Sequence, residues 1–399
     1  MTRVASLFSQ LLSHLPRHEF QTLVQTHGAE YQSKGFACWT QLVSMLFCHL
    51  GHADSLRDIC NGLVCALGKM VHLGIGRAPN KSTLAYANEH RPARLFQDFF
   101  YATLHRFRDM GMLGHRKSKF RFHNKLLSLD ATTVALCLSL FPWAKFRRAK
   151  GGIKLHVLLD HDGYVPIFVH VTEARRHEST IAKSLTLPPD SIVAVDLGYT
   201  DYKLFGDWTR QGVYFVSRLK DNAIYKVLEE RTPPQRSNIM YDYVIRLTGT
   251  KAAEKCPFPL RIIGVWDAEN QREIVLLTNH LDFGATTIAA IYKDRWEIEL
   301  FFKLLKQQLK IKTFVGTSEN ALLIQIWTAL IAVLILKWLH FISKAGWSLS
   351  NMAFLLRANL FSYRDLQAWL DDPTGTPPLT PEIEQLTLNL PGLGQLSTK

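Results

Sequence analysis

Five short apolar runs in the middle of the chain constrain its fold most strongly. Each has the length and the β-branched content of a buried strand, and polar or glycine-containing segments separate them. They cover residues 126–134, 153–159, 165–171, 192–197 and 213–217. A turn at 160–163 joins the second run to the third, and helices are expected at 179–185 and 201–208. The pattern predicts an α/β fold in which a mixed sheet carries flanking helices and begins with an antiparallel meander.

Two of these runs deliver an aspartate at their ends. Asp130 comes directly after the stretch 126–129 of the first run and is followed by Thr132, whereas Asp196 comes directly after the stretch 192–195 of the fourth run and precedes Gly198. A single acid in such a place is often only a turn residue or a helix cap. If the two strands are neighbours, however, the two carboxylates meet at the same point of the sheet.

A third acid, Glu299, is surrounded by residue types that bind phosphate. Tyr292, Arg295, Glu299 and Lys306 are three, four and seven residues apart, so they share one face of a helix, with Trp296 beside them. A second face is apolar and is expected to be buried; it contains Ile291, Ile298, Phe302, Leu305 and Leu309. The alternative is an ordinary surface helix with a mixed-charge face.

The spacing of Tyr292, Arg295, Glu299 and Lys306 resembles the signature of DDE transposases of the insertion sequence four family. Asp130 and Asp196 look like the first two catalytic aspartates of that family. The resemblance implies a ribonuclease H-like core and a β-rich insertion at about 213–285, before the glutamate helix. Leu197 differs from the arginine of many relatives, so the resemblance supplies no DNA contact at that position.

By this resemblance the protein cuts the DNA ends of a mobile element, through a hairpin intermediate, and joins them to target DNA. Asp130, Asp196 and Glu299 would hold two Mg²⁺ ions about 4 Å apart, with Mn²⁺ as a substitute. Tyr292, Arg295 and Lys306 would hold phosphates. Trp296 or Trp266 would stack a flipped base; for Trp266 the surroundings favour an ordinary core residue, and for Trp296 packing against the sheet is the alternative. The family further implies a homodimer on paired terminal inverted repeats.

The overall charge agrees with a DNA-binding protein. The net charge of +13 and the pI near 9.4 favour a polyanion as partner. Six cysteines without paired metal spacing, and an N-terminus without a signal peptide, indicate a bacterial cytoplasmic protein that joins the nucleoid when bound to DNA. The apolar segment 321–336 is too short for a membrane span and is expected to be a buried helix, so no membrane partner is predicted.

Basic residues interleaved with aromatic ones precede the second strand and continue along it. Such a segment is expected to follow a DNA backbone, the alternative being a flexible basic loop without a fixed partner. Its basic residues are Lys145, Arg147, Arg148, Lys150, Lys154 and His156, the last two on one face of the strand.

Helices are expected at 39–50 and 54–67, and a third at about 81–89, extended by 94–108 after Pro92; a glycine-rich turn at 73–79 separates the second from the third. Asn80 is a good N-cap, which makes a helix-turn-helix plausible, with Lys81 and Ser82 in the turn that meets DNA. A plain helical pair is the alternative. The predicted domains are a helical DNA-binding domain (1–114), a catalytic domain (115–345) and a C-terminal tail (346–399). A catalytically silent DNA-binding protein derived from a transposase is the competing function.

Overall fold

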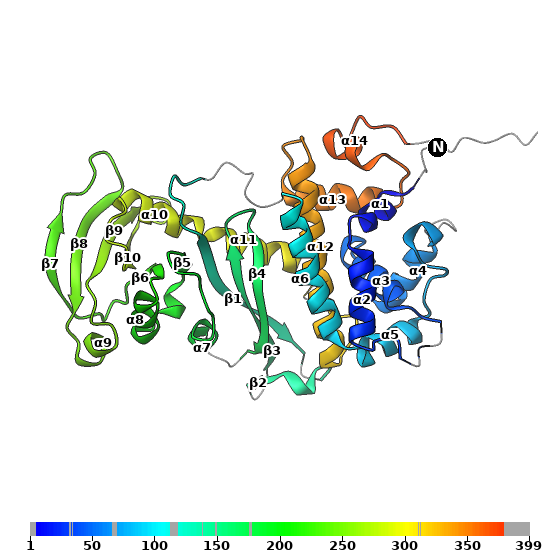
Figure 1. Ribbon diagram of the computed structural model, residues 1–399, viewed down its shortest axis with the longest axis horizontal. Helices are drawn as coiled ribbons and strands as arrows, with labels where there is room; N and C mark the ends of the chain where they lie inside the picture. Colours follow the sequence, from blue (N-terminus) through cyan, green and yellow to red (C-terminus); the bar gives the residue numbers. More distant parts are fainter. Residues whose placement is uncertain are drawn as a thin grey trace, which may run out of the picture.

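The computed structural model describes residues 5–31, 33, 35–65, 70–111, 119–137, 139–147, 150–174, 178–309, 311 and 313–378, and only the backbone at 145–147, 150 and 308. Within these ranges a ten-stranded sheet lies beside a layer of helices (Figure 1). A long helix lies between these two parts and contacts both, α12 (Glu319–Ile342).

The sheet is mixed, as the sequence predicts. The first part of it contains β1 (Leu126–Leu136), β2 (Lys145–Arg147), β3 (Lys150–Asp160), β4 (Val165–Glu173), β5 (Ile192–Val195) and β6 (Tyr214–Arg218). β1, β3 and β4 form the expected antiparallel meander. β5 is parallel to β1 and to β6; α7 (Glu178–Ala182) precedes β5, and α8 (Tyr202–Arg210) connects β5 to β6. The five runs seen in the sequence are therefore strands of one sheet.

The strands after β6 extend the same sheet instead of forming a separate one. They are β7 (Tyr225–Arg231), β8 (Ile239–Leu247), β9 (Leu260–Asp267) and β10 (Arg272–Thr278), with α9 (Thr250–Lys255) between β8 and β9. Their order from β6 outward is β10, β9, β8, β7, all antiparallel. A buried bidentate ion pair joins Arg261 to Asp242 at 2.7 and 2.6 Å and ties β9 to β8.

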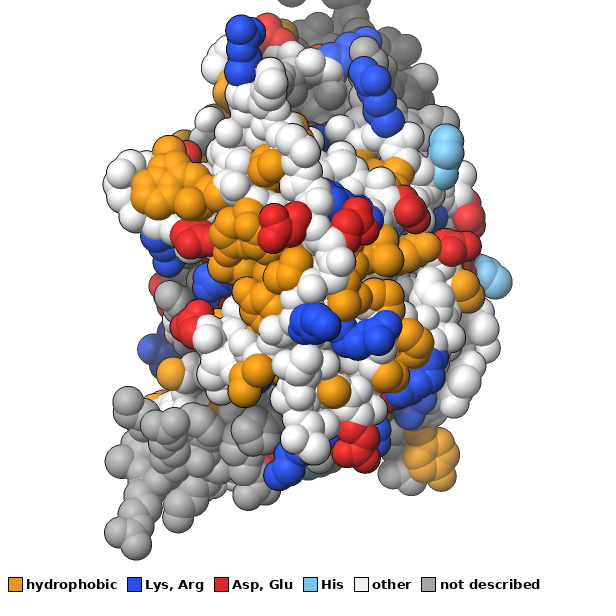
Figure 2. All heavy atoms as spheres, turned by 90° about the vertical axis from the view of Figure 1, so that its left-hand side faces the viewer, with side chains coloured by type: hydrophobic (Ala, Val, Ile, Leu, Met, Phe, Trp, Pro, Cys, Tyr) orange, Lys and Arg blue, Asp and Glu red, His pale blue; other side chains and the backbone are white. Residues whose placement is uncertain are grey.

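The outer end of the sheet exposes apolar side chains. β7 is an edge strand, and exposed hydrophobic residues of this end include Ile224, Tyr225, Leu228 and Met240. Figure 2 shows hydrophobic side chains gathered at the centre of this face with acidic and basic ones around them. The surface is therefore a mixed one.

The helical layer combines segments from both ends of the chain. It contains α1 (Leu7–Ser13), α2 (Arg17–Thr26), α3 (Cys38–Leu50), α4 (Leu56–Val64), α5 (Lys81–His90), α6 (Ala93–Asp109), α13 (Leu349–Asn359) and α14 (Leu366–Asp371). α12 packs on α3, α5 and α6 in one continuous hydrophobic core. Asn80 precedes α5 as expected, but its side chain makes no capping hydrogen bond. α1 and α2 precede the helices expected from the sequence, which begin at residue 39.

α12 is long and apolar enough to cross a membrane by length and composition. Nevertheless, 89% of its most apolar stretch is buried inside the protein. Gln325 and Thr328 are fully buried on it and hydrogen-bond to neighbouring backbone carbonyls. A helix whose surface is covered all round by protein is a core helix, as the sequence predicts.

Candidate active site

The parallel pair of β1 and β5 brings Asp130 and Asp196 together. Leu129 and Val195 form the last rung of this pair, so the next residue on each strand is an aspartate. The prediction that Asp130 ends its strand is wrong. β1 continues to Leu136 because β3 pairs with it along the full length, and only β5 stops at the acid. Asp130 consequently lies where β1 still pairs with β3 on one side but no longer has β5 on the other.

Glu299 reaches this point through a broken helix. The sequence predicts one regular stripe, but α10 (Ala285–Asp294) ends before Arg295, α11 (Trp296–Lys303) follows it, and residues 304–308 form a π-helix. The expected apolar face is buried throughout: Ile291, Ile298, Phe302, Leu305 and Leu309. Burial of that face turns the other one toward β1 and β5. A π-helical turn is a common feature of functional sites because it changes the direction of the side chains that follow.

Arg295 lies between two of the three acids. Its Nη1 is 3.6 Å from Oδ2 of Asp130, and its Nη2 donates to Oε1 of Glu299 at 2.8 Å. The guanidinium carbon is 5.4 Å from the centre of the Tyr292 ring, an arrangement that favours a cation–π contact. Arg295 is only 9% exposed. The arginine thus links the glutamate helix to β1.

Tyr292 and Lys306 complete the contacts between this helical segment and the strands. The hydroxyl of Tyr292 donates to Oδ1 of Asp196 at 3.4 Å. The ammonium of Lys306 donates to the hydroxyl of Thr132, two residues beyond Asp130. Tyr292, Arg295 and Lys306 therefore contact Asp196, Asp130 and Thr132 respectively, and Glu299 is held by Arg295.

Burial and crowding of like charge perturb the site. Burial raises the pKa of Asp130 to about 6; the Ala131 backbone amide and Arg295 oppose this rise, and the charges of Asp196 and Glu178 add to it. Burial likewise raises the pKa of Tyr292. A carboxyl whose ionised form is disfavoured, in a partly exposed cluster of acids, is typical of a functional site.

Sequence reasoning missed three residues of the site. Glu178, at the start of α7, lies close enough to Asp130 to raise its pKa, and it pairs with Lys154 at 3.1 Å. Tyr199 is fully buried beside the acids, and burial followed by the charges of Asp130, Glu178 and Asp196 raises the pKa of its hydroxyl. Arg218, at the end of β6, opposes the rise of the Tyr292 pKa. None of them carries a local sequence signature.

Gly198 has a steric role beside Glu178. A Cβ atom at this position would lie 2.8 Å from Oε2 of Glu178, which is closer than real Cβ contacts allow. The sequence suggests glycine as a tight exit from the strand. The structure adds that the missing side chain makes room for the fourth carboxylate.

The oxygen donors suit a hard divalent cation, but they are not gathered around one point. In the ranges that the structure describes, no three Asp, Glu, His or Cys side chains lie close enough together to hold a metal ion. The guanidinium of Arg295 lies where the Glu299 and Asp130 carboxylates would otherwise meet. Near the acids, the buried hydroxyl of Tyr199 and Nε of Arg295 lack hydrogen-bond partners among the described residues. The residues fit Mg²⁺ in kind, because it prefers carboxylate oxygens.

A second buried acid supports the break between α10 and α11. Asp294 is 3% exposed and accepts hydrogen bonds from Nδ1 of His161 at 2.7 Å, from Lys119 at 2.5 Å and from Tyr164 at 3.3 Å. Nε2 of His161 is 2.7 Å from the hydroxyl of Ser128 on β1. Ser128 is fully buried, so this Ser-His-Asp chain is a structural link and not a hydrolytic triad. It fixes Arg295, the next residue, relative to Asp130.

The other predicted DNA-contacting residues are less close to the acids. Trp296 is 57% exposed and Trp266 is 39% exposed, so the core setting considered for Trp266 is wrong. Lys81 and Ser82 are exposed in the first turn of α5. The expectation for His156 is wrong, because its imidazole is fully buried, with Nε2 3.0 Å from the hydroxyl of Thr172. Arg148 and the side chains of Lys145, Arg147 and Lys150 lie outside the described residues.

Comparison with known proteins identifies the family. The model of the transposase DDE domain matches residues 121–335, more than half of the 399 residues. The chain belongs to the DDE transposase family. A domain of unknown function (DUF4372) matches residues 3–76, which covers the first helices of this transposase.

Named relatives agree with this assignment. A putative transposase, y4zB, of Sinorhizobium fredii is 31% identical over 314 residues, covering 76% of this chain and 83% of the relative. A probable transposase for insertion sequence element IS5377 of Geobacillus stearothermophilus is 32% identical over 245 residues, covering 60% and 64%. A putative transposase for element IS4SA of Synechocystis is 25% identical over 315 residues, covering 74% and 82%. The predicted insertion-sequence transposase is thereby confirmed.

A solved structure of the piggyBac transposase synaptic complex with hairpin DNA also resembles the chain. The likeness has a TM-score of 0.41 at 11% identity and covers 92% of this chain and 81% of that one. This similarity is too low to bear on the fold or the reaction.

Proposed function

We propose that this transposase cuts the DNA ends of its own insertion sequence in a metal-dependent reaction and joins them to target DNA. The supporting observation is the meeting of Asp130, Asp196 and the Arg295–Glu299 pair where β5 ends. The strand order β4, β3, β1, β5, β6, with the last three parallel, supports a ribonuclease H-like core.

The three acids would hold Mg²⁺, or Mn²⁺ in its place. When bound, two such ions supply the charge that activates the attacking oxygen and stabilises the leaving oxygen in an in-line displacement at phosphorus. Asp130 and Asp196 are already adjacent. Glu299 joins them once its contact with Arg295 is exchanged for one with substrate or metal. Protonation of Asp130 below its raised pKa of about 6 removes one ligand, which ties the activity to neutral or alkaline pH.

Arg295, Tyr292 and Lys306 would position the phosphate to be cut. The planar guanidinium of Arg295 offers two parallel donors, and the neighbouring Tyr292 ring holds its plane. Lys306 reaches the same region from the π-helical segment, as a point charge beside Thr132. Arg218 adds a further positive charge near Tyr292. Together these groups offset the charge that develops on the phosphate oxygens in the transition state.

The hairpin path is proposed for this enzyme as well. It requires a sharply bent DNA end with an unstacked base, and a free aromatic surface is one way to hold such a base. Trp296, next to Arg295, is 57% exposed, and Trp266 is 39% exposed. Trp296 is the better candidate because its neighbour in the chain contacts two of the acids. DNA recognition by Lys81 and Ser82, a homodimer on paired ends and the predicted domain boundaries belong to the same proposal.

The test is Mg²⁺-dependent cutting of a labelled duplex that carries one element end with its flanking DNA. A denaturing gel of time points should show a nick at the boundary and then a species that migrates as one strand covering both original strands. Linear products without that species contradict the hairpin path alone. Binding of the end without any cutting, in Mg²⁺ or Mn²⁺, contradicts the proposed reaction and supports a silent DNA-binding protein.

A further inference from the structure

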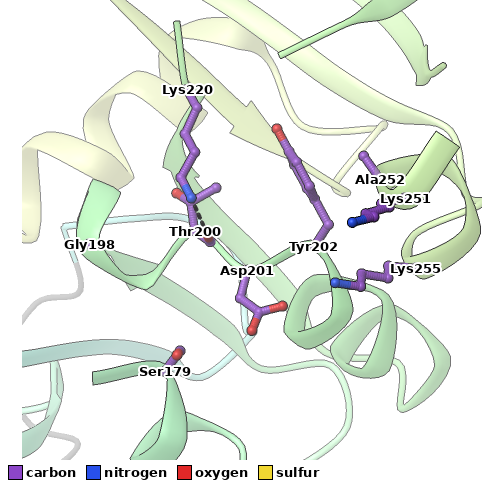
Figure 3. A pocket seen from close by; sticks show the side chains of 9 residues that line it. All are labelled: Ser179, Gly198, Thr200, Asp201, Tyr202, Lys220, Lys251, Ala252 and Lys255. Atoms are coloured by element: carbon purple, nitrogen blue, oxygen red, sulfur yellow. Dashed lines mark hydrogen bonds between the residues drawn. The ribbon is translucent and has the colours of Figure 1, made fainter. Parts of the chain in front are cut away.

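A second site lies on the other side of the loop that carries Asp196. A cavity of about 510 Å³ opens between this loop, the start of α8 and α9 of the extended sheet (Figure 3). Of its lining residues only Gly198 is named from the sequence, as the residue that lets the chain leave the strand after Asp196. The lining residues are Ser179, Gly198, Thr200, Asp201, Tyr202, Lys220, Lys251, Ala252 and Lys255.

Three lysines give the cavity an uncompensated positive charge. Lys251 and Lys255 extend from α9 toward Tyr202, and Lys220 approaches from beyond the end of β6, where its ammonium donates to the Thr200 carbonyl at 2.7 Å (Figure 3). In the described ranges no carboxylate lies within ion-pair distance of the three ammonium groups. An anionic partner is therefore favoured.

The one acid of the lining, Asp201, is already engaged. Its Oδ2 pairs with Lys183 at 2.5 Å, and its Oδ1 accepts the backbone amides of Lys203 and Leu204 as the N-cap of α8. Tyr202, in contrast, has a buried hydroxyl without a hydrogen-bond partner among the described residues. The cavity therefore combines unpaired cations with a donor that a ligand could satisfy.

The position of the cavity indicates which anion it receives. Gly198 lines the cavity. It lies two residues after Asp196, on the short 3-10 turn Leu197–Tyr199 that begins directly after this aspartate. Phosphates follow one another every ~3.4 Å along the axis of a DNA strand. A strand held at Asp196 therefore carries further phosphates past the opposite side of this turn. Lysines from two separate elements suit a repeating backbone charge better than the fixed geometry of one small ligand.

We propose that Lys220, Lys251 and Lys255 bind the phosphodiester backbone of the DNA strand that continues past Asp196. The inference rests on the proposed function, because it requires DNA at the acids. It assigns the α9 segment of the extended sheet a direct DNA contact. That DNA is the element end, its flank or the target. All three have the same phosphodiester backbone, and the experiment distinguishes between them.

The experiment compares two double variants with the wild-type chain in DNA binding at a series of salt concentrations without divalent metal. Lys251→Glu/Lys255→Glu changes two exposed side chains of the cavity, so folding is expected to be preserved. The matched control is Lys226→Glu/Arg246→Glu, the same charge change on an exposed cross-strand pair of β7 and β8. The cavity variant should lose at least about tenfold in affinity at low salt, and its salt dependence should fall by the value of about two phosphate contacts. The control should stay within about twofold of wild type.

Three duplexes distinguish the source of the strand. One stops at the element boundary, one continues into flanking DNA, and one is an unrelated target offered to the complex with a pre-cut end. A loss confined to one duplex assigns the cavity to that DNA. Equal losses in the cavity and control variants, or an unchanged salt dependence in the cavity variant, overturn the proposal.

Two further readouts distinguish a DNA-backbone site from a small-anion site, and the cavity from the active site. Inorganic pyrophosphate is added to the wild type and to the cavity variant. If it raises the melting temperature of the wild type only, and the cavity variant binds DNA as tightly as the wild type, the cavity is a small-anion site and the proposal fails. Cutting by the wild type is measured in the same preparation. If the wild type cuts normally and the cavity variant binds DNA as tightly as the wild type, only the proposal for the cavity is contradicted. If the wild type does not cut but the cavity variant shows the expected loss of binding, only the proposed reaction is contradicted.

Discussion

Asp294 is buried and Asp130 is half-buried, and these two aspartates beside Arg295 have opposite surroundings. Asp294, at the end of α10, accepts hydrogen bonds from His161, Lys119 and Tyr164; burial opposes ionisation, but His161 and Lys119 hold its pKa below the ordinary value. Asp130, on β1, has Asp196 and Glu178 near it, and its favourable contacts are one backbone amide, that of Ala131 at 2.7 Å, and Arg295 at 3.6 Å; burial raises its pKa to about 6. Both are acids next to the same helix break, yet only one is satisfied.

We interpret the difference as one between an acid that holds the fold together and an acid that the proposed reaction uses. A buried carboxylate with three donors stabilises its ionised form and links the elements around it. A carboxylate crowded by others is a cost to the folded protein, which is retained where a ligand or substrate later supplies the missing charge. Substitutions at the two kinds of acid can show whether this contrast is real.

The largest expected effect is on cutting. Asp130→Ala, Asp196→Ala and Glu299→Ala should each lower the rate of Mg²⁺-dependent cleavage by at least ~10³-fold, because each removes a proposed metal ligand. Binding to the element end should remain within a few fold of wild type. Asp162→Ala, in the exposed turn after β3, is the matched control. Near-normal cutting by any one of the three variants removes that residue from the site.

The contrast also explains how much of the fold the sequence predicts. Five strands of the first part of the sheet agree with the apolar runs to within a few residues, because short β-branched runs pack well in a largely buried sheet, whereas the short β2 corresponds to no such run. β7 has no such signal, since it is an edge strand of largely exposed residues, among them Lys226, Glu229 and Glu230. An exposed edge carries no hydrophobic pattern.

The site is predictable only where spacing repeats a known pattern. Asp130, Asp196 and the Tyr-Arg-Glu-Lys set can be named from the chain, whereas Glu178 cannot, since it is a lone acid on a five-residue helix that tertiary contacts bring to the centre. The helix break at Arg295 has no proline or glycine to announce it. The error at His156 has a related cause: alternation assigns residues to a face of a strand without saying which face is covered.

The second effect tests the structural acid. Asp294→Asn should lower the free energy of unfolding by about 3 kcal/mol, because it removes a buried charge and leaves His161 and Lys119 without their partner. The pKa of Asp294 is lowered in the folded protein, so its contribution is present above the ordinary value of 3.8 and is lost as the pH falls through the folded value. Urea denaturation should show a constant deficit from pH 6 to 8 that shrinks only below about pH 4.

The control for this variant is Asp207→Asn. Asp207 pairs with Arg210 on the exposed side of α8, and such pairs contribute about 0–1 kcal/mol. A deficit of Asp294→Asn no larger than that of Asp207→Asn would mean that the link between β1 and the helix break is not important for stability.

The third effect concerns Arg295, which contacts Asp130 and Glu299 and directly follows Asp294 in the chain. Arg295→Lys keeps the charge but loses the two-pronged donor, so the cleavage rate should fall by about 10²-fold while end binding changes little. Arg295→Ala should lower the cleavage rate further, and the hairpin species should be absent from a denaturing gel. Arg272→Lys, an exposed arginine on β10, is the control. Full activity of Arg295→Lys would show that charge alone is needed at this position.

The smallest effect is the most discriminating, because its sign is opposite to that of the Asp294 variant. The raised pKa of Asp130 means that its proton contributes stability below the ordinary value of 3.8 and that this contribution is lost as the pH rises through about 6. A shift of about two units at a largely buried side chain corresponds to about 1–3 kcal/mol. Asp130→Asn should therefore stabilise the protein at pH 8 without divalent metal, and the gain should disappear by about pH 4. Added Mg²⁺ should raise the melting temperature of the wild type but not of Asp130→Asn, since only the wild type can bind the ion. A loss of stability at pH 8 would mean that the Asp130 carboxylate is held by the fold in the same way as that of Asp294, and the distinction between the two acids would fail.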